Sequence, residues 1–382
     1  MSSQPVASPL AEKYLRLHLC PEVGPIRFAN LLRELGDIDT VLGAGVSRLM
    51  AVEKIGQKVA GNIARERDSA RVTEEIELAG RYGVRILCLA DEEYPPPLKK
   101  IEDPPACLYV KGTLTRNDLL ALGVVGSRHC TRYGAEQAER FAALAAHAGM
   151  TIASGMARGI DSAAHRGALA ASGRTIAVLG CGLCHIYPPE SGELAEKISA
   201  AGALVSELPM GVAPDSKNFP PRNRIIAGLS MGVLIVEAAR RSGALITARL
   251  ASEYNRVVFA VPGRIDTASA EGCNDLIKTG AAKLVMGLPD ILQELGDAGA
   301  ALMSAFAPPE ERGEVVAQRS LPLDEAEKTV LAAIVGEPLP IEGVCEESGL
   351  PPARVAAVLT SLQLKGVIRR LPGDLYERAG RQ

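Results

Sequence analysis

The sequence contains no tryptophan and only 5 phenylalanines among 382 residues, so its core must rely on aliphatic side chains and alanine. It also lacks any apolar run long enough to cross a bilayer, so no transmembrane helix is predicted. The first residues show no charged segment followed by an apolar one, which argues against a secretory signal. The 8 cysteines follow no regular framework, and we therefore expect reduced thiols in a cytoplasmic protein.

An overall excess of positive charge is missing as well, because the formal net charge is −3. The charge is unevenly distributed: residues 1–120 carry −1, residues 121–280 carry +3 and residues 281–382 carry −5. A surface that binds a polyanion is therefore expected in the middle of the chain, with its cations gathered on one face.

A chain of this length is expected to form more than one domain. We predict an N-terminal helical domain over residues 1–85 and an α/β domain over residues 86–295. An Ala-, Pro- and Glu-rich linker follows over residues 296–320, and a small winged-helix-like domain over residues 321–382. Prolines at 95, 96, 97, 104 and 105 indicate a rigid connector without regular helix at the start of the α/β domain.

The fold class is best indicated by the middle of the chain. Apolar runs such as TIAVLG, GVLIVE and VVFAVPG alternate with segments of helical periodicity. Strands that are apolar throughout, separated by helices, are typical of a parallel sheet covered on both faces. We therefore predict a Rossmann-like, doubly wound, mostly parallel sheet.

The flanking domains give weaker functional signals. The N-terminal helices around Glu22 to Pro25 fit a helix-hairpin-helix-like or SAM-like module, but no cation lies at the turn, which favours a packing role over phosphate binding. Three helices and a hairpin predict the C-terminal winged helix. Its third helix carries only Arg354 and Lys365 as cations, which favours protein contact or structural capping over direct reading of DNA.

Two strand-to-helix turns carry candidate anion-binding groups. Gly126, Ser127 and Arg128 follow the first parallel strand, where free N–H groups of the next helix face a ligand. Gly155 and Arg158 follow the next strand, and the glycine lets the backbone approach a ligand closely. Further along that segment, we expect Asp161 to cap a helix and His165 to pack inside the fold.

The densest basic run precedes an apolar helix. Lys217, Arg222 and Arg224 supply positive charge, Asn223 supplies an amide, and Phe219 is one of the few aromatic rings in the chain. A cation that follows the backbone and a ring that stacks on an unpaired base are the two groups that a single strand requires. This run is the strongest candidate for nucleic-acid binding.

Other chemistries find little support in the sequence. A dinucleotide fingerprint begins at Gly180 and Gly182, but His185 stands where its third glycine is required. The Cys181/Cys184 pair has no second pair to complete a zinc site. Glu237 is a lone carboxylate that is a candidate base, or a candidate for orienting Arg224 or Ser242. We expect no cofactor, no metal and no catalysis; the alternative is a Rossmann-like enzyme acting on a small nucleotide.

Several ordered motifs resemble those of the DprA/Smf family of DNA-processing proteins. They include VVGSRHCTRYG, SGMARGIDSAAHRGAL, FPPRNRIIAGLS and VEAARRSGALITARLA, within a match over about residues 90–290. The resemblance implies a homodimeric, non-enzymatic mediator that protects incoming single-stranded DNA and loads the RecA recombinase during natural transformation.

The resemblance also assigns residues. It implies DNA contacts at Gly126, Ser127, Arg128, Gly155, Arg158, Lys217, Phe219, Arg222, Asn223 and Arg224. It further implies a dimer contact around Leu276, Ile277 and Leu284.

Overall fold

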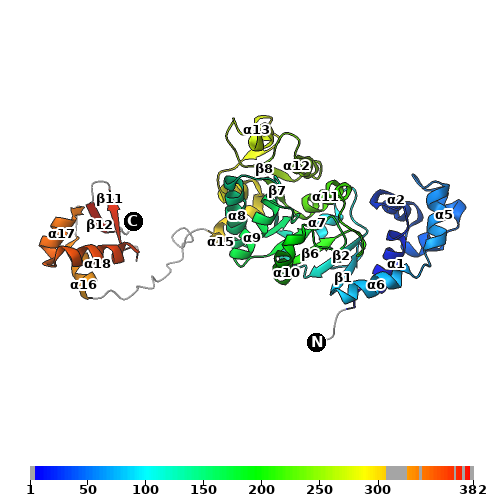
Figure 1. Cartoon of the computed structure of the whole chain (residues 1–382), viewed down its shortest axis with the longest axis horizontal. Coiled ribbons are helices and arrows are strands. Elements are labelled where there is room, and N and C mark those ends of the chain that lie inside the picture. Colours follow the sequence, from blue (N-terminus) through cyan, green and yellow to red (C-terminus); the bar gives the residue numbers. More distant parts are fainter. Residues whose placement is uncertain (1–4, 307–324, 335–337, 365–366, 372–374, 379–382) are drawn as a thin grey trace. The chain divides into compact units, whose positions relative to one another are not determined.

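The computed structural model describes residues 5–306, 325–334, 338–364, 367–371 and 375–378 (Figure 1). The chain divides into two compact units, Met1–Ala307 and Pro308–Gln382.

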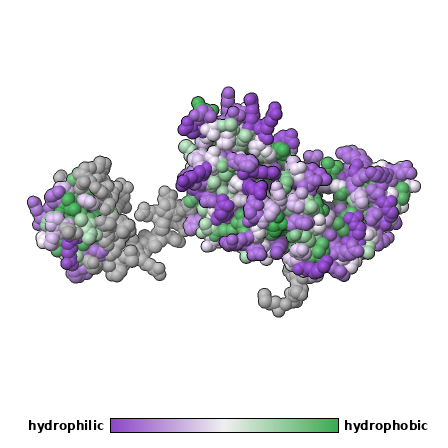
Figure 2. All heavy atoms as spheres, viewed as in Figure 1, coloured by the Kyte–Doolittle hydropathy of each residue, from purple (hydrophilic) through white to green (hydrophobic). Residues whose placement is uncertain are grey.

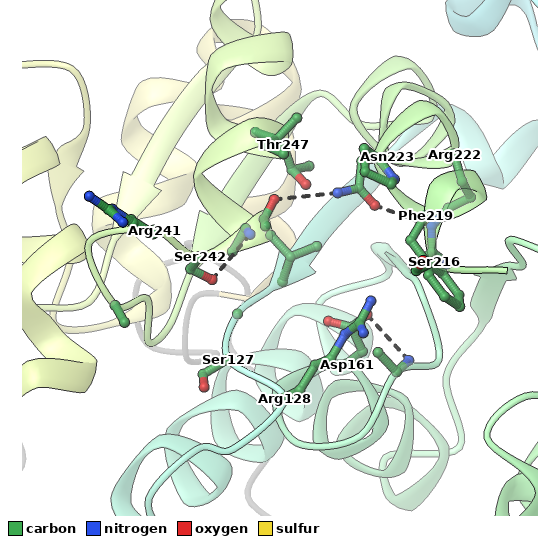
Figure 3. A pocket seen from close by; sticks show the side chains of 18 residues that line it. Ser127, Arg128, Asp161, Ser216, Phe219, Arg222, Asn223, Arg241, Ser242 and Thr247 are labelled. Carbon is green, nitrogen blue, oxygen red and sulfur yellow. Dashed lines mark hydrogen bonds between the residues drawn. The ribbon is translucent and has the colours of Figure 1, made fainter.

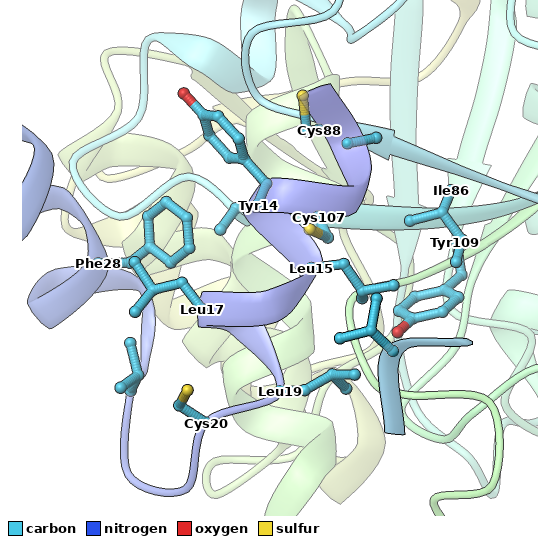
Figure 4. Packing of buried hydrophobic residues seen from close by; sticks show 14 of the residues in the cluster. Tyr14, Leu15, Leu17, Leu19, Cys20, Phe28, Ile86, Cys88, Cys107 and Tyr109 are labelled. Atoms are coloured by element: carbon cyan, nitrogen blue, oxygen red, sulfur yellow. The ribbon is translucent and has the colours of Figure 1, made fainter. Parts of the chain in front are cut away.

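The first unit begins with short helices, as predicted. They are α1 (Pro9–His18), α2 (Pro25–Leu35), α3 (Ile38–Gly43), α4 (Val46–Met50), α5 (Gln57–Glu66) and α6 (Arg71–Arg81). Prolines start α1 and α2, where the missing N–H costs no intrahelical hydrogen bond. Leu15 of α1 packs with Ile86 and Tyr109 of the sheet (Figure 4). The helices therefore share one core with the edge of the sheet, and the domain boundary at residue 85 stays a prediction.

A nine-stranded sheet forms the centre of this unit. Its strands are β1 (Val84–Cys88), β2 (Cys107–Gly112), β3 (Ala121–Val125), β4 (Thr151–Ser154), β5 (Thr175–Val178), β6 (Ala203–Ser206), β7 (Gly232–Ile235), β8 (Val257–Ala260) and β9 (Lys283–Leu284). The spatial order is β1-β2-β6-β5-β4-β3-β7-β8-β9. All pairs from β6 to β9 are parallel, whereas β1–β2 and β2–β6 are antiparallel. The predicted doubly wound, mostly parallel sheet is confirmed.

Helices cover both faces of the sheet. One face carries α8 (Arg132–His147), α9 (Ile160–Ala170), α10 (Gly192–Ala201), α14 (Leu288–Glu294) and α15 (Gly296–Phe306). The other carries α7 (Pro96–Lys99), α11 (Phe219–Leu229), α12 (Gly243–Glu253) and α13 (Glu271–Lys278). Successive side chains of a strand point to opposite faces of the sheet. In β5, Ile176 and Val178 pack on the face covered by α11 and α12, whereas Ala177 packs on the opposite face. This two-sided burial explains why the strands are apolar throughout.

Two segments differ from the sequence-based expectation. The proline-rich connector contains the one-turn helix α7. Its prolines lie at the first helical positions, where proline is tolerated, whereas proline in the interior of a helix would break it. Residues 296–306, predicted as the start of a linker, form α15, and its Leu302 is buried in the core shared with α8 and α14. Residues 307–320 of that linker lie outside the described residues.

The second unit has the predicted winged-helix arrangement. It consists of α16 (Glu325–Ala333), β10 (Leu339–Pro340), α17 (Ile341–Ser348), α18 (Pro352–Leu364), β11 (Ile368–Leu371) and β12 (Leu375–Arg378). The strands form an antiparallel sheet in the order β10-β12-β11. Val330, Val344 and Leu359 lie in its core, while Arg354 of α18 is exposed. Lys365 lies outside the described residues.

Hydrophilic side chains cover much of the visible face of the Met1–Ala307 unit (Figure 2). Across the residues that the structure describes, no helix is long and apolar enough to span a membrane.

His165 of α9 is fully buried, with one ring nitrogen beside a hydroxyl. Its Nδ1 lies 2.7 Å from Oγ1 of Thr175, and that hydroxyl donates to the carbonyl of Ile152. The hydroxyl must therefore accept a hydrogen bond from Nδ1–H, so the neutral ring carries its proton on Nδ1, and the unprotonated Nε2 has no partner in the described structure. Burial lowers the pKa of His165 to about 3.

We predict that the contribution of His165 to folding falls by about 2 kcal/mol between pH 7 and pH 5. The unfolded chain binds a proton through its ordinary pKa near 6.5, whereas the folded protein does not until far lower pH, so acid favours unfolding. Urea unfolding of the wild type and His165→Leu at both pH values measures this difference. An equal loss of stability in the two proteins would contradict it.

Candidate functional site

The sheet has one point where its winding direction reverses. From β3 the chain moves outward through β4, β5 and β6, and it then returns to β7 on the other side of β3. The connections after β3 and β7 therefore diverge and leave a crevice at the carboxyl ends of these strands, where open α/β sheets bind ligands. A cavity of about 460 Å³ lies there (Figure 3).

The crevice collects side chains from several segments. Ser127 and Arg128 come from the β3–α8 connection, Phe219 and Asn223 from α11, and Thr247 from α12 (Figure 3). Gly126 and Arg222 line it too, so six of the ten predicted DNA-contacting residues meet in one place. The start of α12 also faces the cavity, and a helix N-terminus presents partial positive charge there.

Glu237 holds the β3–α8 connection in place. Its carbonyl accepts a hydrogen bond of 2.7 Å from Ser127 N, and its carboxylate accepts bonds of 2.9 and 2.6 Å from N and Oγ1 of Thr131. A side chain on Gly126 would clash, since its Cβ would lie 2.8 Å from the carbonyl of Glu237. Glu237 contacts neither Arg224 nor Ser242 through its side chain, so it acts as a structural anchor for this loop.

Removing the acceptor at Glu237 should loosen the loop. We expect Glu237→Leu to lower the free energy of unfolding by about 1–3 kcal/mol, because two donors of Thr131 lose their buried partner. Glu237→Gln is the matched control, since its amide can accept from the Thr131 N–H and donate to the hydroxyl. Chemical unfolding and hydrogen exchange of residues 126–131 measure the effect; equal behaviour of both variants would contradict this role.

Arg222 is buried beneath the crevice. Its Nη1 donates to the carbonyl of Gly155 at 2.7 Å and also to that of Val178. A Cβ on Gly155 would lie 2.6 Å from both Nη atoms and from Oδ2 of Asp161, so only glycine fits between these charges. Burial lowers the pKa of Arg222 to about 10 and raises the pKa of Asp161. Asp161 accepts from Ala157 N at 3.3 Å and is not the N-cap of α9.

Phe219 forms the aromatic wall of the crevice. The guanidinium carbon of Arg128 lies 4.8 Å from the centre of its ring, and that of Arg222 lies 5.8 Å away. The centre of the Tyr187 ring lies 5.5 Å from the centre of the Phe219 ring. Arg128 is exposed and has no carboxylate partner among the described residues. Two cations therefore lie beside the ring, and the exposed one, Arg128, is available to bind an anion.

Four of the predicted contacts do not line the crevice, and one of them, Gly155, lies beneath it with its carbonyl bonded to Arg222. Arg158 forms two hydrogen bonds with Glu190, at 2.5 and 3.1 Å, in a neighbouring groove. Lys217 is exposed and pairs with Asp215 at 3.0 Å.

Arg224 is 4% exposed, and its guanidinium pairs with Asp103 at 3.0 Å and Glu207 at 2.6 Å. The geometry gives Arg224 a structural role, and a direct DNA contact by this side chain finds no support in it.

The crevice also includes residues outside the ten predicted DNA contacts. Arg241 and Ser242 follow β7, and Ser242 caps α12 through the N–H of Ala244. Thr247 is 1% exposed, and its Oγ1 has no hydrogen-bonding partner within the described structure. The signal available for all three was their position after a strand that ends at the same sheet edge.

The residues predicted for dimerisation lie elsewhere on the unit. Leu276 and Ile277 of α13 are partly buried against the core, and Leu284 of β9 is 46% exposed. Met286 and Ile265, both strongly exposed, add apolar surface. The homodimer stays a prediction. Among the described residues, no group of three or more His, Cys, Asp or Glu side chains is placed to hold a metal ion.

The fold and the crevice define a doubly wound α/β protein with a cavity lined by cationic and aromatic side chains at its topological switch point, followed in the chain by a winged helix. The model of the DNA recombination-mediator protein A family matches residues 85–296, and that of the DprA winged helix domain matches residues 316–374. The chain therefore belongs to the DNA recombination-mediator protein A (DprA/Smf) family.

Known members of the family are similar to this chain in sequence and in structure. Protein Smf of Synechocystis sp. is 34% identical over 383 residues, covering 93% of this chain and 96% of that protein. The X-ray structure of DNA processing protein A from Streptococcus pneumoniae superimposes with a TM-score of 0.66 at 34% identity, over 74% of this chain and 97% of that one. DNA processing protein A of Helicobacter pylori, which binds single-stranded DNA, superimposes with a TM-score of 0.50 at 30% identity, over 56% and 95% of the two chains.

Proposed function

We propose that this protein binds single-stranded DNA in the crevice between the β3 and β7 connections and leaves the strand chemically intact. The observation that carries the proposal is the Phe219 ring, flanked by Arg128 and Arg222 at the switch point of the sheet. A ring that stacks on a base and cations that attract phosphates bind any sequence, because every base has an aromatic face and every nucleotide a charge.

The electrostatics of the crevice favour a polyanion. Arg128 and Arg241 are exposed at its rim, and neither has a carboxylate partner among the described residues. The start of α12 adds the positive end of its dipole. The similarity to the Helicobacter pylori protein supports the same ligand for this chain.

The remaining roles rest on the family. We infer a mediator that works in the cytoplasm during natural transformation, as a homodimer, and delivers the RecA recombinase onto the bound strand. Ten residues were predicted for the DNA site, and the six that line the crevice are the ones we retain as direct contacts: Gly126, Ser127, Arg128, Phe219, Arg222 and Asn223.

A small-nucleotide enzyme remains the second candidate, because the size of the cavity is that of a small-molecule site. The arrangement of its acids argues against catalysis. Asp161 lies beside the buried Arg222, and Glu237 is fully engaged by Thr131, so neither carboxylate is available as a base.

The two candidates differ in what they bind and release. An end-labelled strand of ~20 nucleotides and AMP are each incubated with the protein, and bound and converted material are measured. We expect tight binding of the strand, full recovery of its length on a denaturing gel, and no conversion of AMP. Cleavage of the strand, or turnover of AMP without strand binding, would overturn the proposal.

A further inference from the structure

A second hollow lies on the other side of the β3–α8 connection. It has a volume of about 650 Å³ and opens between the first turn of α8 and the segment that follows β8. Thr131, Tyr133, Glu237, Pro262 and Arg264 are among the residues that line it. None of the ten residues predicted to contact DNA lines this hollow.

Tyr133 gives the hollow an aromatic surface. The side chain is 48% exposed at the start of α8, and no hydrogen bond or ring contact ties it to another described residue. Its ring therefore has a free face beside a hollow whose walls are largely apolar. An exposed ring in a concave setting is the kind of platform on which an unpaired base stacks.

Cations accompany this ring. Arg264, at the rim of the hollow, has a side chain that is 80% exposed and pairs with Asp266 at 2.8 Å. Such exposed pairs contribute little stability, so the guanidinium can exchange Asp266 for a phosphate at small cost. Arg240 and Arg241 follow β7, and both are exposed without a carboxylate partner in the part of the chain that the structure describes.

The β3–α8 connection, which Glu237 holds in place, contributes residues to the walls of both the crevice and the hollow. The carbonyl of Glu237 accepts from Ser127 on the crevice side, and its carboxylate accepts from Thr131 on the side of the hollow. The crevice, at about 460 Å³, has the size of a small-molecule site, whereas proteins of this kind hold several nucleotides. Most of a bound strand must therefore lie outside the crevice.

We propose that this hollow is a second contact site for the same DNA strand, in which Tyr133 stacks on a base and Arg264 binds a phosphate. The inference rests on the proposed function, since it extends the path of a strand that enters the crevice. It predicts that Tyr133 and Arg264 matter only for strands long enough to reach them.

Strand length separates the two sites experimentally. Binding of dT strands of ~4 and ~20 nucleotides is measured for the wild type, Tyr133→Leu and Arg264→Ala. Each variant should weaken binding of the long strand by about tenfold and that of the short strand by less than about twofold. The matched controls are Tyr82→Leu, a tyrosine that is 45% exposed, and Arg249→Ala, an arginine whose side chain is 72% exposed and paired with Glu253. Both should bind like the wild type.

The outcomes are distinguishable. If both variants bind the long strand normally while Arg128→Ala weakens it, the hollow is not a DNA site and the crevice proposal stands. If Arg128→Ala binds normally as well, the proposed function itself fails. Equal weakening of the binding of short and long strands would show that Tyr133 acts through the crevice. A changed oligomeric state in sedimentation, without a change in DNA affinity, would assign the hollow to contact between copies of the chain. Either result overturns the inference.

Discussion

Arg128→Ala should weaken binding of single-stranded DNA by about tenfold to a hundredfold at low salt. Arg128 is exposed at the crevice beside the ring of Phe219, with no carboxylate paired to it among the described residues, and a charged hydrogen bond to phosphate contributes about 1.5–3 kcal/mol. The slope of log affinity against log salt should also become shallower by about 0.7, because the variant neutralises one phosphate fewer and therefore releases fewer counterions from the single strand. Fluorescence anisotropy of a labelled strand at several salt concentrations measures both quantities.

The chain offers a closely matched control for this variant. Arg140 of α8 is also exposed and also lies over a phenylalanine, with its guanidinium carbon 6.0 Å from the ring centre of Phe141, but it is remote from the crevice lining. Arg140→Ala should keep the affinity and the salt slope of the wild type. Identical losses in the two variants would mean that only overall charge matters and that the crevice has no special role.

Arg222→Met should lower the free energy of unfolding by about 3–5 kcal/mol, the largest stability effect that we expect from a single substitution in the site. The guanidinium is 6% exposed and donates to two carbonyls, and Asp161 is the opposite charge that acts on it. Without the cation, a buried carboxylate and two buried acceptors lose their partner. Denaturant unfolding at neutral pH measures the change.

A second substitution identifies the cause of that loss. Because the penalty comes largely from the unpaired charge of Asp161, Arg222→Met combined with Asp161→Asn should be less destabilised than the sum of the two single variants. Strictly additive losses would show that the two side chains do not interact. Burial itself opposes both charges, as the lowered pKa of Arg222 and the raised pKa of Asp161 indicate, so the pair is retained at a cost to stability.

The parallel sheet could be predicted because each of its strands is recognisable from its own residues. Runs such as β5 and β7 are apolar on both faces, which indicates burial between two layers of helices. The antiparallel edge formed by β1 and β2, and the packing of α1 against it, were not predictable. Both depend on pairing between segments far apart in the chain, and local periodicity does not report such pairing.

The candidate site was predictable in part for a related reason. Ser127 and Arg128 follow a strand directly, so the topology of a parallel sheet places them at its carboxyl edge. Arg222 and Arg224 were grouped because both are cations in one basic run. Residues two positions apart in a helix, however, are rotated by about 200° about its axis, so their side chains point to opposite sides. Arg222 therefore lies beneath the crevice while Arg224 meets Asp103 and Glu207, and helical periodicity was the signal that could have separated them.

Photo-cross-linking tests the central claim most directly. A dT strand carrying photoreactive thymines is bound to the protein, irradiated, and the labelled peptides are identified by mass spectrometry. The account predicts labels in residues 126–133 and 216–224, on both sides of the crevice, and loss of these labels in Arg128→Ala. Labels confined to residues 321–382, or labels that persist unchanged in the variant, would contradict it.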